Sequence, residues 1–456
     1  MTFELGIEGG TVVTPQGRSA LNVYVAGGAI AAVTADRLGA SERRDATGLL
    51  VLPGGVDTHV HLMDPAATDR EDFPTGTSAA ARAGVTTVVE HTHAGPVRTP
   101  ADLEDKRRYL QDRSIVDYAL AAHAWPDHIA QVGALWRAGV AFIKVFTCTT
   151  HGVPGFDAGE LLRLFRSSAE VGAVCLVHCE DETITADAER ELRSTGRDDP
   201  SVIIEWRSRE AELTALAVVA QLSRLTGARI VTAHVSNTEA LSVVGRERDD
   251  GAPITIETCP QYLALFEDEI VKEGAFRKFT PPARARGPED LAAMWAAVSD
   301  GRIDHISTDH APSTAEQKRD GSIWEVHFGL PGLDTTFPFL LDAAASGAIS
   351  YERLVEVYAE SPARTYGLYP RKGRVAVGAD ADVVLVDPTA TWTVRNEDVI
   401  SRAGWSPFEG RTFSGRAVDT YLRGRRIVNE GTVVEGPGCG RFLHGAGQKM
   451  DIGGRR

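Results

Sequence analysis

The chain has 456 residues, five cysteines and a formal net charge of −15 at pH 7. This length exceeds one small core and predicts one large domain accompanied by a smaller one. The negative charge, without a lysine/arginine run or a basic amphipathic stretch, argues against a nucleic-acid or anionic-membrane surface. A small molecule is therefore the expected partner.

The cysteines and the N-terminus indicate where the protein works. The cysteines are odd in number and lack CxxC spacing, so we expect reduced thiols. The N-terminus has no basic start followed by an apolar stretch, and no apolar run reaches the ~18 residues of a membrane span. These features predict an unprocessed cytoplasmic protein with no membrane partner.

Both ends of the chain carry short β-prone runs without helical periodicity. From Phe3 to about Val33 such runs are broken by glycine pairs, and similar short β-prone runs return at 382–387, 392–394 and 420–428. We predict one small β-sandwich domain built from both termini, residues 1–52 plus 373–456, around a larger domain of residues 53–372. The alternative is two independent small sheets, although each end alone offers few strands and little burial.

The middle of the chain alternates buried strand-like runs with amphipathic helical patterns. Helical spacing is clear over residues 161–165 and 213–220, and the second pattern closes at Gly227. Eight strand-then-helix units predict an α/β fold, a parallel (β/α)8 TIM barrel. A doubly wound open sheet is the alternative, but no glycine-rich nucleotide fingerprint follows the first strand. The expected strands end at His59 or cover Thr86–Glu90, Asp117–Ala122, Val140–Phe146, Ala173–His178, Arg229–His234, Ile254–Thr258 and Ile303–Thr308.

Metal-ligating residue types recur at the ends of these strands. The apolar run Leu49–Leu52 leads into Asp57-Thr58-His59-Val60-His61, where alternate side chains share a face, so His59 and His61 can bind one ion. A single strand-end histidine is more often an ordinary core residue, but a recurring set indicates a metal site in a barrel, whose active site lies at the C-terminal strand ends. The other members of the set are Lys144, His178, His234 and Asp309.

Lys144 is unusual because it lies within the apolar run Ala141–Phe146. An unpaired ammonium there would cost several kcal/mol to bury. Burial beside cations lowers a lysine's pKa, and the neutral amine can take up CO2 to form a carbamate able to bridge two metals. The alternative is a buried ion pair between Lys144 and a neighbouring carboxylate.

The ordered motifs resemble the amidohydrolase superfamily, in the branch that holds hydantoinases, dihydropyrimidinases, allantoinases and dihydroorotases. The resemblance runs essentially from end to end of the chain. The matching segments are Gly55–His61, Lys144, His178–Glu180, His234–Ser236, Glu257–Leu263, Ser307–Pro312, Ser361–Arg364 and Gly378–Asp382.

The resemblance implies a binuclear metal-dependent cyclic amidohydrolase. His59, His61 and Asp309 would hold one divalent ion and His178 and His234 the other, with carboxylated Lys144 and a hydroxide between them. The hydroxide would attack a ring carbonyl, and Asp309 would pass a proton to the leaving nitrogen. Zinc is the expected metal, although the donor types also suit manganese, iron or cobalt. Asp57 either orients an imidazole or serves as a polar cap at the strand end.

Departures from the family pattern bear on the substrate. Dihydroorotases place an arginine two residues beyond the second histidine and an asparagine after strand two to hold a carboxylate. This chain has Met63 at the first place and Glu90-His91-Thr92-His93 at the second, which disfavours dihydroorotate. D-selective hydantoinases and dihydropyrimidinases carry an oxyanion-binding tyrosine where this chain has Thr149. Thr149, His151 and His123 are the candidates to replace it, and the roles of His91 and His93 stay open.

The remaining sequence segments are most similar to those of L-selective hydantoinases and of allantoinases. We therefore expect opening of a hydantoin-like cyclic amide or ureide, with allantoinase as the alternative and dihydropyrimidinase or dihydroorotase ranked behind. A non-catalytic scaffold relative is disfavoured because every ligand position is filled, and a mononuclear deaminase would not need Lys144. The resemblance implies a homo-oligomer, a dimer or tetramer. The expected substrate contacts are Met63, Thr149, His151, Thr280, Phe328 and Gly329.

Overall fold

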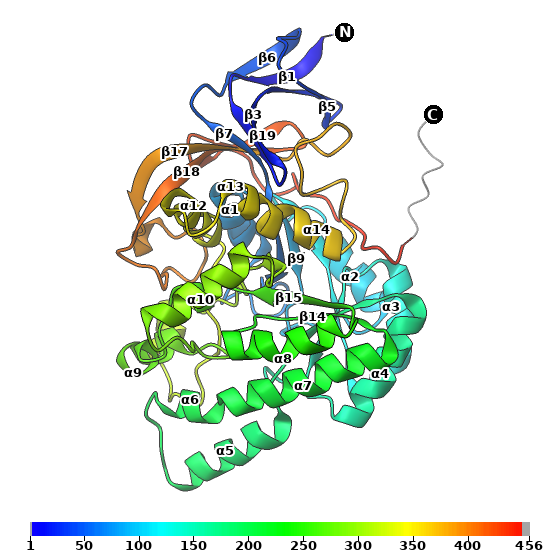
Figure 1. The fold of residues 1–456 in the computed structure, drawn as a ribbon, viewed down its shortest axis with the longest axis vertical. Helices are drawn as coiled ribbons and strands as arrows, with labels where there is room; N and C mark the ends of the chain where they lie inside the picture. The colour runs from blue at the N-terminus through cyan, green and yellow to red at the C-terminus, as the bar shows by residue number, and fades with distance from the viewer. Residues whose placement is uncertain (1, 449–456) are drawn as a thin grey trace.

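The computed structural model describes residues 2–448, which form a parallel β-barrel surrounded by helices and a two-layered β-sandwich. The sandwich lies at one end of the molecule, and most barrel helices lie at the other end (Figure 1). The predicted fold class, a (β/α)8 barrel with a β-sandwich built from both termini, is confirmed.

The barrel strands pair in chain order and all run parallel. The third strand is interrupted at Ala121, whose N–H bonds to the Glu90 carbonyl of the second strand. The ring closes where His61 N donates to His310 O at 2.7 Å, so the alternative of an open sheet is wrong. The strands are β8 (Gly55–Val60), β9 (Val85–Glu90), β10 (Asp117–Leu120) with β11 (Ala122–His123), β12 (Ile143–Phe146), β13 (Val174–His178), β14 (Arg229–Thr232), β15 (Ile254–Thr258) and β16 (His305–Ile306).

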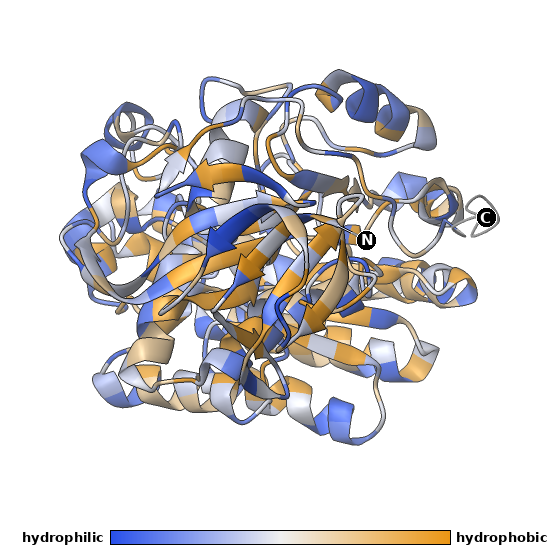
Figure 2. Cartoon of the chain, turned by 90° about the horizontal axis from the view of Figure 1, so that it is seen from above, coloured by the Kyte–Doolittle hydropathy of each residue, from blue (hydrophilic) through white to orange (hydrophobic). Residues whose placement is uncertain are grey.

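The barrel forms because its strands are buried on both faces, as expected for a parallel sheet covered by helices. Every residue of β12 and of β13 is buried. Seen from the sandwich end, the strands at the centre of the molecule, with those of the sandwich in front, carry much hydrophobic colour, and the surrounding helices carry both hydrophilic and hydrophobic colour (Figure 2).

Helices cover the barrel where the apolar patterns predicted them. A capping box between Asp157 and Glu160 starts α4, and α7 ends at Gly227, which has φ 71°. The barrel helices are α1 (Phe73–Ala83), α2 (Pro100–Leu110), α3 (Val132–Ala138), α4 (Ala158–Val171), α7 (Arg209–Thr226), α8 (Thr238–Asp249), α10 (Pro288–Ser299) and α12 (Thr336–Ser346). Shorter helices lie in the connections: α5 (Glu182–Ser194), α6 (Val202–Trp206), α9 (Glu269–Glu273), α11 (Ala315–Arg319), α13 (Tyr351–Val355) and α14 (Ser361–Thr365).

The sandwich joins the two ends of the chain in one sheet. Its seven-stranded layer has the order β20-β19-β18-β17-β7-β2-β3, so C-terminal β17 pairs with N-terminal β7. The two independent small sheets considered above are therefore ruled out. The strands of this layer are β2 (Thr11–Thr14), β3 (Gly17–Ala20), β7 (Leu50–Pro53), β17 (Val383–Thr393), β18 (Thr412–Leu422), β19 (Arg425–Asn429) and β20 (Thr432–Val433). The four-stranded layer contains β1 (Phe3–Glu8), β4 (Asn22–Ala26), β5 (Ala29–Thr34) and β6 (Ala40–Asp45).

The apolar run Leu49–Leu52 does not extend the first barrel strand. Residues Leu50–Pro53 form β7 in the sandwich, and the strand that carries His59 starts only at Gly55. Gly54 separates the two strands, and a Cβ atom there would lie 2.1 Å from the Thr86 hydroxyl oxygen. A glycine is therefore needed where the chain passes from sandwich to barrel.

A buried ion cluster ties the sandwich to the barrel. Lys372 Nζ lies 2.5 Å from Asp117 Oδ2 at the start of β10 and 2.6 Å from Asp382 Oδ2 just before β17. Asp380 Oδ2 lies 2.9 Å from the same ammonium, and Arg423 also contacts Asp117. The three carboxylates could otherwise hold a cation, but Lys372, Arg423 and Arg371 together already balance their charge.

Among residues 2–448, no helix combines the length and apolar character needed to cross a membrane.

The Lys372 cluster predicts a large stability effect. Lys372→Met is expected to lower the free energy of unfolding by about 3–5 kcal/mol, because it leaves buried carboxylates without their cation. The matched control is Lys272→Met, which removes an i,i+4 pair with Asp268 whose side chains are 65% exposed, and should change that energy by about 0–1 kcal/mol. Equal midpoints for the two variants in denaturant unfolding would contradict the proposed role of the cluster.

Candidate metal centre

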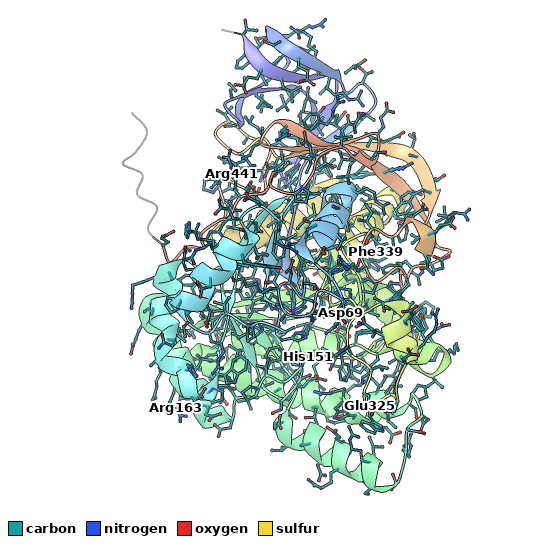
Figure 3. The ribbon with its side chains drawn as sticks, turned by 180° about the vertical axis from the view of Figure 1, so that it is seen from behind. Asp69, His151, Arg163, Glu325, Phe339 and Arg441 are labelled. Atoms are coloured by element: carbon teal, nitrogen blue, oxygen red, sulfur yellow. The ribbon has the colours of Figure 1, made fainter. Side chains whose placement is uncertain are left out.

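The C-terminal ends of the barrel strands open into one cavity. It brings together all six predicted metal ligands, His59, His61, Lys144, His178, His234 and Asp309. Four of the predicted substrate contacts also line it: His151, Thr280, Phe328 and Gly329. His93, Phe146 and Ala311 complete the lining. Side chains from the barrel interior and from the loops above it therefore meet in one place, with His151 over the middle of the barrel in Figure 3.

Two predicted contacts lie elsewhere. Met63 is fully buried in the loop after β8, where its sulfur accepts a hydrogen bond from the Thr92 hydroxyl at 3.2 Å, and it does not line the cavity. Thr149 is exposed, and its hydroxyl accepts from Gly155 N at 3.3 Å. In this structure neither side chain reaches the cavity.

One half of the site is formed by β8 and the end of β16. Asp309 Oδ1 lies 3.2 Å from His59 Nε2 and 3.3 Å from His61 Nε2. Lys144 Nζ approaches the same His59 nitrogen at 3.4 Å. Four potential donor groups thus converge from strands one, four and eight.

The other half is formed by β13 and the turn after β14. His178 Nδ1 and His234 Nε2 lie 2.9 Å apart, and the His59 and His234 rings are 5.5 Å apart. Asp309 and His234 have φ angles of 50° and 39°, an unusual conformation for residues other than glycine. Backbone strain of this kind is concentrated at functional sites.

Lys144 has no carboxylate partner within the described residues. Its side chain is 1% exposed, and no carboxylate oxygen of residues 2–448 lies within 4.0 Å of Nζ. Burial lowers the pKa of Lys144 to about 8. The alternative of a direct ion pair therefore finds no support, and a larger fraction of this amine is neutral near pH 7 than of an ordinary lysine.

Carboxylates behind the rings orient two of the imidazoles. Glu257 Oε1 lies 2.7 Å from His59 Nδ1, and Glu180 Oε2 lies 2.7 Å from His178 Nε2. Burial would raise the pKa of Glu180, but Arg207 and His178 lower it to about 2. Neither glutamate was assigned a role from the sequence, although Glu180 follows β13 and Glu257 lies within β15, both inside the motifs quoted above.

Asp57 is a polar cap and does not orient an imidazole. Its carboxylate accepts hydrogen bonds from Tyr358 Oη at 2.8 Å and from the backbone N–H groups of His59 and Thr308 at 3.3 and 3.2 Å. Burial raises the pKa of Asp57 to about 6. Its contacts join the first and last strands of the barrel next to the site.

Further imidazoles surround His61. The His91 ring lies 4.3 Å from that of His61, and His93 stacks on His151 with centroids 4.2 Å apart. Both ring nitrogens of His91 and of His123 are buried without a hydrogen-bond partner. His59, His61 and His91 also offer ligand atoms that all lie within 4.8 Å of one another.

This donor set fits metal ions. His61 Nδ1 and His234 Nδ1 are buried without a hydrogen-bond partner, and imidazole with carboxylate is a donor combination suited to divalent cations. A histidine-rich group of this kind is compatible with a binuclear metal site.

The Glu257 contact can be tested separately from catalysis. Glu257→Gln is expected to lower the affinity for divalent metal about 10–100-fold, because the His59 ring loses the carboxylate that fixes it. The readout is metal content after dialysis against a graded chelator series. Glu104→Gln, on α2 with a 48% exposed side chain, is the control. Identical metal retention by both variants would remove Glu257 from this role.

Comparison with known proteins agrees with this geometry. The Amidohydrolase family model matches residues 50–427. An allantoinase of Rubrobacter xylanophilus is 36% identical over 448 residues, with 97% of each chain covered. An L-hydantoinase of Paenarthrobacter aurescens is 31% identical over 452 residues, covering 97% of this chain and 98% of the relative. The solved structure of L-hydantoinase (dihydropyrimidinase) from Arthrobacter aurescens has a TM-score of 0.93 at 30% identity, covering 97% of this chain and 100% of that one. The chain belongs to the amidohydrolase family.

Proposed function

We propose that the protein is a hydrolase that opens the ring of a hydantoin-like cyclic amide or ureide. The observation that carries this proposal is the convergence of His59, His61, Lys144, His178, His234 and Asp309 in one buried cavity. Relatives named allantoinase and L-hydantoinase, matched over almost the whole chain, support the ring-opening class.

His59, His61 and Asp309 would hold one divalent cation, and His178 and His234 a second. We further propose that Lys144 is carboxylated, so that its carbamate supplies an anion to both, and that the metal is zinc. When bound, such cations supply an acidified water and polarise the carbonyl under attack. The low pKa of Lys144 and its lack of a carboxylate partner support the carbamate.

Asp309 is the proposed proton carrier. Its Oδ1 faces both His59 and His61, and burial raises the pKa of its carboxyl group. A carboxylate with a raised pKa accepts a proton from the attacking water more readily and returns it to the leaving ring nitrogen. The same oxygen thus lies where a ligand and a general base are both needed.

The residues that line the cavity help to indicate which cyclic substrate the protein binds. Thr149, at the position of the family's oxyanion-binding tyrosine, is exposed, whereas His151 lines the cavity. We propose that His151 takes part in binding the carbonyl side of the substrate, while Thr280, Phe328 and Gly329 border the ring. Hydantoin-like rings come first and allantoin second, with dihydropyrimidine and dihydroorotate rings behind them.

Domain boundaries, location and assembly belong to the same proposal. We propose a barrel of residues 53–372 and a sandwich of residues 1–52 plus 373–456, of which 449–456 lie outside the described residues; the change from sandwich strand β7 to barrel strand β8 at Gly54 supports a boundary near residue 53. We also propose a cytoplasmic protein that forms a homotetramer or a dimer.

A ring-hydrolysis panel tests the function. The metal-loaded protein is offered hydantoins, allantoin, dihydrouracil, dihydroorotate and simple cyclic imides, and product formation and chirality are measured. We expect a hydantoin or allantoin to give the highest kcat/KM. Asp309→Asn is the control for contaminating activity and should lower kcat at least about 100-fold. If the metal-loaded protein opens none of these rings, the proposed function is wrong.

A further inference from the structure

Arg70 is a buried cation without an anionic partner beside the cavity. It lies in the loop between β8 and α1, its side chain is 4% exposed, and Nε donates to Pro312 O at 3.0 Å. Nη2 is buried without a hydrogen-bond partner. Among residues 2–448, no carboxylate oxygen lies within 4.0 Å of this guanidinium, whereas Arg113, which follows α2, pairs with Asp64 of the same loop as Arg70 at 2.8 Å.

Such an arrangement is costly unless an anion comes from outside the chain. An unpaired buried charge is strongly destabilising, and buried arginines therefore pair with carboxylate or phosphate groups. Asp69 is the carboxylate whose charge opposes the lowering of the Arg70 pKa by burial, and it uses an oxygen to accept from Gln317 Nε2 at 2.8 Å.

Arg70 is near the substrate cavity. Pro312, which accepts its hydrogen bond, directly follows Ala311 of the cavity lining. Burial first, and then nearby charges that include Arg70, lower the pKa of His93 and of His151, two further lining residues. Arg70 itself does not line the cavity, so an anion that meets its guanidinium is bound beyond the lining residues and apart from the metal ligands.

Two other basic side chains on this side of the cavity donate to backbone carbonyls. Lys318 Nζ donates to His327 O at 2.8 Å, and Lys278 Nζ donates to Val326 O at 2.6 Å. Both are 1% exposed and hold the backbone of the segment that supplies Phe328 and Gly329 to the cavity. Burial lowers the pKa of Lys278 to about 7 and that of Lys318 well below its usual range, whereas the pKa of Arg70 stays at about 10, so Arg70 is the one of these three groups that stays charged at pH 7.

We infer that Arg70 binds a carboxylate carried on the exocyclic arm of the ring substrate. The inference rests on the proposed function and narrows its substrate class to hydantoin-like rings with a carboxyalkyl substituent. The guanidinium offers parallel N–H donors that match a carboxylate. Met63 stands where dihydroorotases place their arginine. Arg70 lies outside the cavity lining, so this carboxylate needs an arm that reaches beyond the residues that line the ring site.

The test compares two substrates that differ in one group. Hydantoin-5-propionic acid and its primary amide have the same ring and arm, and only the acid carries the anion. We expect the wild-type kcat/KM to favour the acid by about 30-fold or more, and Arg70→Gln to lower the acid-to-amide ratio about 30-fold. Arg163→Gln, on α4 with a 62% exposed side chain, is the control and should leave the ratio unchanged.

Binding without turnover gives a second readout. In calorimetry, the ring-opened product with the free carboxylate arm should bind wild-type protein more tightly than the product with the amide arm, and Arg70→Gln should remove the difference. Arg70→Lys keeps the charge and is expected to retain part of the preference, which separates loss of the cation from loss of the fold.

The outcomes separate this inference from the proposed function. If wild-type protein opens the amide as well as the acid, or prefers the amide, the Arg70 inference is overturned while ring hydrolysis stands, whether or not the variants fold. If neither ring is opened and no other ring of the panel is, the proposed function itself fails. Weaker product binding by Arg70→Gln together with an unchanged acid-to-amide ratio of kcat/KM also overturns the inference.

Discussion

Lys144 brings an amino group to within 3.4 Å of His59 Nε2 in a cavity where no described carboxylate pairs with it. A permanent ammonium in this position would repel any cation that the surrounding imidazoles bind. Conversion to an anionic carbamate reverses the sign of that interaction. Two divalent cations need this reversal of charge, because the histidines and Asp309 bring only one negative charge to them.

The barrel makes such a concentration of groups possible. Its eight strands end on one face, so residues distant in sequence meet there, and closure through His310 brings the first and last strands together. Asp57 and Tyr358 reinforce that seam, while Glu257 and Glu180 fix the rings of His59 and His178. At the N-terminal end of β10, away from the site, the Lys372 cluster joins the sandwich to the barrel. The rigid parts of the fold thus surround a site whose specificity rests on loops, including those of Arg70 and His151.

The barrel and the six-residue donor set were predictable from the sequence because both follow periodic rules. A buried parallel strand appears as an apolar run, and a ligand at its end is a polar residue in a fixed position. Glu257 escaped assignment because a carboxylate within a buried strand has no signal that identifies its partner. Leu49–Leu52 appeared to belong with the His59 strand, since an apolar run carries no mark of the sheet it joins. Met63, Thr149 and Arg70 lie in loops, whose conformation follows from tertiary contacts and not from periodicity.

Metal analysis of Lys144→Ala, with and without a short carboxylic acid added back, tests the central claim most directly. The account predicts about two divalent ions per wild-type chain, a marked loss of bound metal in the variant, and partial recovery of both metal and activity when the acid replaces the carbamate. A Lys144→Ala protein that keeps wild-type metal content and full activity without any added acid would contradict it.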